Sequence, residues 1–93
     1  MTLSRNTIEC VEKFIFQFAT KKFSDDEILF WAMKNLPTYS KDTFYFFKKT
    51  LREFYYPNGH GFYVINQEKA IYFFEDNEKI LKELKDKFAQ VKK

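Results

Sequence analysis

The chain has 93 residues, 22% of them aromatic, and its 16 basic and 13 acidic side chains leave a formal charge of +3. A chain of this length forms one small domain, so we expect residues 1–93 to be a single unit. The charge permits contact with nucleic acid but excludes a strongly basic, histone-like protein.

No apolar run approaches the ~20 residues of a membrane-spanning helix, and the first residues lack the continuous apolar segment of a signal peptide. We therefore expect a cytoplasmic protein without membrane contact, and a small viral or mobile-element protein fits this description. Cys10 is the only cysteine, which excludes an internal disulfide framework. We predict a small, inert thiol there, and an intersubunit disulfide or a redox switch is the functional alternative.

The first predicted element is a helix over residues 7–22, because apolar side chains recur there at helical spacing. These side chains are Ile8, Val11, Phe14, Ile15, Phe18 and Ala19. A second helix is predicted after Ser24, whose spacing to Glu27 matches a capping box. It ends at Pro37, because the residue before proline disfavours helical geometry. The acidic run 25–27 is expected to cap this helix, with a divalent-cation site as the alternative.

A third helix is predicted over residues 41–54, with Ser40 as its N-cap. Four apolar side chains share one arc of it and are expected to face the core: Phe44, Phe47, Leu51 and Phe54. The polar side chains around the rest of this helix can donate to phosphates or base edges, stack on sugars or, at Asp42, accept from cytosine. These candidate DNA contacts are Ser40, Lys41, Asp42, Tyr45, Lys48, Lys49 and Arg52. The alternative is the ordinary solvated face of an amphipathic helix.

A β-hairpin is predicted after the third helix, because residues 62–66 and 70–74 are rich in aromatic and β-branched side chains. Residues 66–69 would then form its tip and bring Lys69 toward DNA as a further contact. The alternative register has its tip at 57–61, a strong chain break that contains both glycines.

The last predicted element is a helix over residues 75–93. It carries a narrow apolar seam made of Ile80, Leu84, Phe88 and Val91. A seam of this width suits packing against another helix. We predict that it pairs with a second copy in a homodimer, and folding back on the first helix is the alternative.

The order helix, helix, helix, hairpin, with the run SKDTFYFFKKTLREF as third helix, resembles the winged helix-turn-helix DNA-binding superfamily over about residues 7–74. The resemblance implies an α+β, mostly α fold, to which the C-terminal helix is added. It also implies that the third helix (about 41–54) enters the major groove of double-stranded DNA while the hairpin wing lies on the backbone. The expected function is transcription regulation by a small DNA-binding homodimer. The alternative is a protein-interaction module on the same fold, because such scaffolds also bind proteins.

Enzymatic activity is not expected, because the chain has no nucleotide-binding glycine loop, nucleophile elbow or HExxH motif. His60 lies between two glycines and could suit a metal or a proton transfer. It is the only histidine, and no cysteine lies at zinc-ligand spacing from it. We therefore predict no metal and no cofactor, and a flexible loop at His60.

Overall fold

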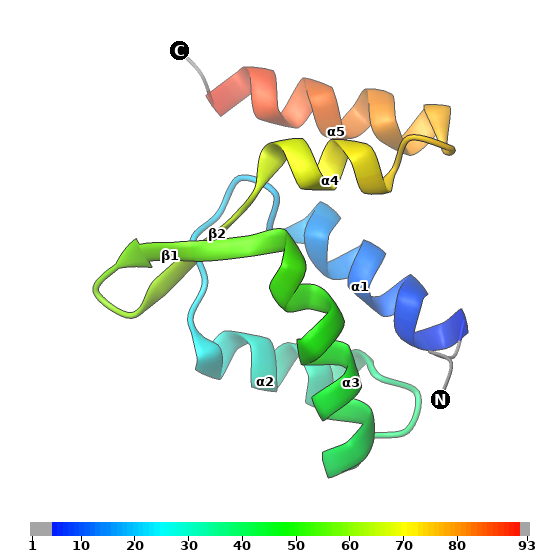
Figure 1. The fold of residues 1–93 in the computed structure, drawn as a ribbon, viewed down its shortest axis with the longest axis vertical. Helices are drawn as coiled ribbons and strands as arrows, with labels where there is room; N and C mark the ends of the chain where they lie inside the picture. The colour runs from blue at the N-terminus through cyan, green and yellow to red at the C-terminus, as the bar shows by residue number, and fades with distance from the viewer. Residues whose placement is uncertain (1–4, 92–93) are drawn as a thin grey trace.

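A computed structural model describes the backbone of residues 5–91 and the side chains of residues 7–90. Within these bounds the fold is α+β and mostly α, with five α-helices, one 3₁₀ turn and one two-stranded antiparallel sheet (Figure 1). The elements are α1 (Arg5–Gln17), α2 (Asp25–Asn35), α3 (Lys41–Leu51), η1 (Arg52–Phe54), β1 (Tyr55–Gly59), β2 (Phe62–Ile65), α4 (Gln67–Phe73) and α5 (Glu78–Val91). None of the helices in this part of the chain has the length and apolar character needed to cross a membrane.

The predicted starts of α2 and α3 are confirmed by their caps. Ser24 Oγ accepts a hydrogen bond from the Glu27 backbone N–H at 3.3 Å. Ser40 and Thr43 form a full capping box, because each side-chain oxygen accepts from the other residue's backbone N–H, at 3.1 and 2.8 Å. Such caps satisfy amide groups that the first helical turn leaves unpaired, and each contributes about 1 kcal/mol.

The first helix ends at Gln17, earlier than the predicted limit at residue 22. The chain then turns, and the Lys21 backbone N–H donates to the Phe18 carbonyl at 3.3 Å. Phe18, Ala19 and Phe23, in and just after this turn, are all buried.

The predicted position of the hairpin was wrong, and the alternative at 57–61 is the one that forms. β1 pairs with β2 around a tip at Gly59–Gly61, where three successive residues have positive φ: 92° at Gly59, 54° at His60 and 80° at Gly61. Glycine adopts such angles without steric cost, so two glycines in this tip make the tight reversal cheap. Residues 66–69 cannot provide it, because Asn66 instead caps α4 by accepting from the Lys69 N–H at 3.1 Å.

The hairpin is attached to the helices by an extra bridge. Phe23, in the loop between α1 and α2, exchanges two backbone hydrogen bonds with Tyr63 of β2, at 3.0 and 2.7 Å. The Tyr63 hydroxyl also donates to Asp25 Oδ2 at 3.1 Å. An isolated two-stranded hairpin is only marginally stable in water, so these ties hold it to the start of α2.

Aromatic rings form the centre of the core. Phe14 meets Phe23, Trp31 and Phe47 edge to face, with centroids 5.1, 5.3 and 6.1 Å away. The Trp31 and Phe47 rings stack at 5.5 Å with planes 9° apart. Because these rings come from α1, the α1–α2 loop, α2 and α3, one cluster fixes how the three helices are arranged.

The apolar seam of α5 packs on its own chain, chiefly beside α4 and not mainly on the first helix as the alternative interpretation had it. Leu84 and Phe88 are 0% and 4% exposed, and Ile80 packs against the same core. Lys87 Nζ donates to the Phe16 carbonyl of α1 at 3.2 Å. Leu84 and Phe88 are therefore not open to a second copy, while the side chain of Val91 lies outside the described residues.

Candidate nucleic-acid interface

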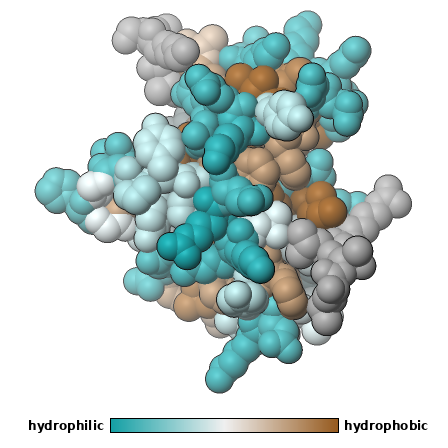
Figure 2. Space-filling model, in the orientation of Figure 1, coloured by the Kyte–Doolittle hydropathy of each residue, from teal (hydrophilic) through white to brown (hydrophobic). Residues whose placement is uncertain are grey.

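The exposed side of α3 gathers four cations and a tyrosine around one shallow depression of about 570 Å³. Its lining is Tyr39, Lys41, Phe44, Tyr45, Lys48, Lys49 and Arg52. At 3.6 residues per turn, the four cations and Tyr45 span an arc of about 100° around the helix. We call these five residues the cationic arc. Figure 2, drawn in the orientation of Figure 1, shows hydrophilic side chains over the C-terminal part of α3 and the start of the hairpin.

Three of the four cations in the arc are available to a ligand. Among the described residues, Lys41, Lys49 and Arg52 have no carboxylate within ion-pair distance. Lys48 is different, because its Nζ lies 3.4 Å from Asp25 Oδ1. Both partners are more than a third exposed, so the pair adds little stability, but it does offset the charge of Lys48.

Tyr45 stands out from the arc with 60% of its surface exposed. Lys49 Nζ lies 6.0 Å from the centroid of its ring, at the outer limit of a cation–π contact, and the Phe46 ring is 5.7 Å away. A tyrosine in this position offers a flat ring for stacking and a hydroxyl for hydrogen bonding.

Ser40 and Asp42 lie at the border of the arc. The side chain and backbone N–H of Ser40 are both engaged in the capping box, so its role in the structure is to start α3. Asp42 is exposed in the first turn and does not line the depression. Its carboxylate favours the positive end of the helix dipole but would repel a nearby phosphate.

Lys69 is not at the hairpin tip, which corrects the sequence-based prediction. It lies exposed in the first turn of α4, and Figure 1 shows α4 and α3 on opposite sides of the hairpin. The structure therefore separates Lys69 from the cationic arc. Residues 55–65 of the hairpin contain no Lys or Arg, and His60 is their only side chain that can become cationic.

Two aromatic residues of the depression were not among the predicted contacts. Phe44 was assigned to the core, yet it is half-buried and also lines the depression, with Lys48 Nζ 6.0 Å from its ring centroid. Tyr39 precedes the cap, and its ring lies 6.0 Å from that of Phe44. An aromatic residue directly before a helix cap was the only signal for Tyr39 in the sequence.

Asp25 connects the arc to the base of the hairpin, since it contacts both Lys48 and Tyr63. The hydrogen bond to Asp25, and then the charge of its carboxylate, raise the pKa of Tyr63, while Arg52 opposes the shift. Burial is the main cause that raises the pKa of Tyr55, followed by the charge of Asp25. Both phenols are therefore neutral hydrogen-bonding groups at neutral pH.

The remaining candidate groups form no site. Cys10 is free and buried, its Sγ lies 3.8 Å from the Asn35 carbonyl, and burial raises the pKa of the thiol. A buried thiol with a raised pKa is a weak nucleophile. In the described part of the chain, no group of three or more His, Cys, Asp and Glu side chains could hold a metal ion.

No protein-family model, curated protein or solved structure matches this chain.

Proposed function

We propose that this chain is a winged helix-turn-helix domain that binds double-stranded DNA through the cationic arc of α3. The observation that carries the proposal is the arc itself, in which four cations and an exposed tyrosine surround one depression without an intervening acid. Phosphate contacts by Lys and Arg provide most of the affinity of such interfaces, and side chains at base edges provide the specificity.

The placement of α3 supports this proposal. Its 11 residues make a rod about 16 Å long, and the major groove of B-DNA, about 12 Å wide, admits an α-helix. α1 and α2 pack against the buried side of α3, which leaves the arc facing outward. The hairpin follows directly after η1, so it lies at the C-terminal end of the same helix (Figure 1).

Different contacts are proposed for the members of the arc. Arg52 can donate two parallel hydrogen bonds to guanine or to a phosphate, and Lys41 and Lys49 provide compact charges for phosphates. Tyr45 reaches a sugar or a phosphate. Lys48 contributes less while Asp25 holds its ammonium group.

A regulator that pairs as a homodimer would need a surface other than Leu84 and Phe88, which the chain already buries.

The test is a matched pair of double variants in a duplex-binding assay. Lys49→Ala/Arg52→Ala removes two charges from the arc, whereas Lys82→Ala/Lys85→Ala removes two exposed charges from α5. We expect the first to weaken binding about 10- to 100-fold at low salt and the second to change it little. If Lys41, Lys49 and Arg52 each neutralise one phosphate, the slope of log K against log salt is about −2.7 and falls to about −0.9 in the first variant. Equal losses in both variants would exclude α3 as the reader.

A protein-interaction module is the second candidate, because one exposed apolar pair lies outside the arc. Phe30 and Met33, three residues apart on α2, are 63% and 54% exposed. Residues three apart on a helix are neighbours, so the pair forms a small apolar patch of the kind that binds proteins. The hairpin also lacks the Lys and Arg side chains that would suit a phosphate backbone. Absence of any salt-sensitive binding to random duplex at low salt would favour this candidate.

A further inference from the structure

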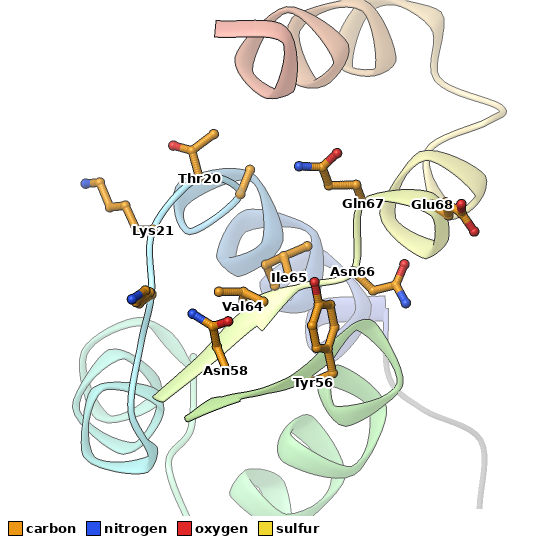
Figure 3. A pocket seen from close by; sticks show the side chains of 11 residues that line it. Thr20, Lys21, Tyr56, Asn58, Val64, Ile65, Asn66, Gln67 and Glu68 are labelled. Carbon is orange, nitrogen blue, oxygen red and sulfur yellow. The ribbon is translucent and has the colours of Figure 1, made fainter. Parts of the chain in front are cut away.

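A second open cleft lies on the side of the hairpin away from α3, with a volume of about 750 Å³ (Figure 3). Its walls are the turn after α1, the hairpin and the start of α4. Strand geometry explains which hairpin side chains face it. Tyr55 and Ile65 pair on the side of the core, so the next pair, Tyr56 and Val64, points to the other side.

The middle of this cleft carries no charged side chain, and both apolar side chains and uncharged polar groups line it. Thr20, Tyr56, Asn58 and Gln67 bring two hydroxyls and two amides to it from three separate elements. Within the described residues, the side chains of Tyr56, Asn58 and Gln67 make no hydrogen bond to the protein. Tyr56 is 49% exposed, so its ring is open to a flat ligand.

The charges stand at opposite ends of the cleft. Lys21 and Lys22 come from the turn after α1, and Glu68 comes from the first turn of α4. Figure 3 shows Lys21 and Glu68 on opposite sides of the hydroxyl and amide groups. A ligand that fits this arrangement has an anionic end, a flat middle that accepts and donates hydrogen bonds, and a donor at the far end.

We propose that this cleft binds an unpaired nucleotide. The base would stack on Tyr56 and form hydrogen bonds with the amides of Asn58 and Gln67. Aromatic side chains and amides bind single bases in this way. The phosphate would lie at Lys21 and Lys22, and Glu68 would accept from an exocyclic amine of the base. A base inside a duplex cannot enter, because its edges are paired and its faces are stacked.

This site does not depend on the proposed role of α3. Two kinds of ligand have the chemical groups that this cleft would recognise: a free nucleoside phosphate and an unpaired nucleotide at the end of a single strand. A free nucleotide would make the cleft an effector site, whereas a strand end would extend the nucleic-acid contacts of the domain to the second side of the hairpin.

The first experiment maps binding by amide chemical shifts of the whole chain, titrated with adenosine 5′-monophosphate and with a short 5′-phosphorylated single-stranded oligonucleotide. Shifts are expected at residues 20–22, 56–58 and 66–68. If only the oligonucleotide binds, the source is a strand end; if the mononucleotide binds as well, a free nucleotide suffices. No shift with either probe at millimolar concentration, or shifts confined to α3, would overturn the proposal.

Matched variants test the two ends of the site. Tyr56→Ala should weaken binding about tenfold, because one stacking platform is lost, whereas Tyr72→Ala removes an exposed tyrosine of α4 and should not.

Lys21→Ala/Lys22→Ala should weaken binding of the monophosphate but leave binding of adenosine itself unchanged, and Lys82→Ala/Lys85→Ala should affect neither. Gln67→Glu keeps the size of the side chain and the start of α4, so it tests the amide even if Tyr56→Ala loosens the hairpin. Equal effects of the cleft variants and their controls would contradict the assignment.

Discussion

The inner and outer sides of α3 come from the same eleven residues but have separate tasks. On the inner side, Phe47 and Leu51 are fully buried, and the Phe47 ring packs with rings of α1 and α2. On the outer side, Lys41, Tyr45 and Lys49 are exposed. Changes on the inner side should therefore act on stability, and changes on the outer side should act on binding. Asp25 is the exception, because it contacts the outer side and also holds the hairpin.

The largest expected effect is on the inner side. Phe47→Ala removes a fully buried ring that stacks on Trp31 and contacts Phe14, and it leaves a cavity between three helices. We expect a loss of about 3–5 kcal/mol in the free energy of unfolding, measured by urea titration. Since a small domain has only about 5–15 kcal/mol in total, this variant can be largely unfolded at 37 °C.

Two companion variants make that comparison sharp. Phe47→Leu retains most of the apolar volume and should cost less than about 1.5 kcal/mol. Tyr45→Ala, two residues away and on the outer side, should change stability by no more than about 0.5 kcal/mol. A Tyr45→Ala variant as unstable as Phe47→Ala would show that the two sides of α3 are not separate.

The sides of α3 could be predicted from the sequence because helical spacing and caps are local signals. Ser24 and Ser40 each precede a helical pattern as an N-cap residue does. In the structure each hydroxyl accepts a hydrogen bond from the backbone N–H three residues later. The inward arc at Phe47 and Leu51 follows from 3.6-residue periodicity alone. The ion pair of Lys48 could not be predicted in this way. Its partner Asp25 is distant in sequence, and the two side chains meet only when α2 packs on α3.

The chain after α3 was harder to predict, because its composition favours strands while its tertiary contacts favour a helix. Four of the five residues 70–74 are aromatic or β-branched, which is typical of a strand. Ala70 and Phe74 are nevertheless buried while Tyr72 between them is exposed. A strand would place all three on one face, whereas a helix turns Tyr72 away from the other two. The decisive local signal was Asn66, which caps α4 as a helix N-terminus requires. The two glycines beside His60 were the matching signal for the true hairpin tip.

A smaller effect is expected at Asp25, where the outer side of α3 meets the hairpin. Asp25→Asn removes the ion pair with Lys48 but keeps an oxygen that can accept from Tyr63. The free energy of unfolding should fall by less than about 1 kcal/mol, because the pair is exposed. If the arc binds DNA, affinity at low salt should rise about three- to tenfold, since Lys48 is released and a negative charge is lost.

Asp86→Asn is the control for this change, because it removes one exposed carboxylate from α5 and alters the net charge equally. Duplex affinity should rise more in Asp25→Asn than in Asp86→Asn when both are measured at the same ionic strength. Equal gains would mean that net charge alone, and not the release of Lys48, determines the affinity.

The smallest effect concerns the same contact at alkaline pH. The hydrogen bond to Asp25 raises the pKa of Tyr63 in the folded chain above that of an ordinary tyrosine. A group with a raised folded pKa contributes stability that is complete below its unfolded pKa, about 10 for tyrosine, and is lost as the pH rises through the folded value.

The difference in urea midpoint between the natural chain and Tyr63→Phe should therefore be constant up to about pH 9 and shrink above about pH 10. Burial also raises the pKa of Cys10, which is present in both proteins, so its contribution cancels. The pKa of Tyr55 is raised by burial and by the charge of Asp25 in both proteins, and only the smaller contribution of Tyr63 is lost in Tyr63→Phe. Tyr72→Phe controls for the loss of a phenol as such. A difference that does not change with pH would mean that the Tyr63 hydroxyl is not held by Asp25, and the outer side of α3 would then lose its link to the hairpin.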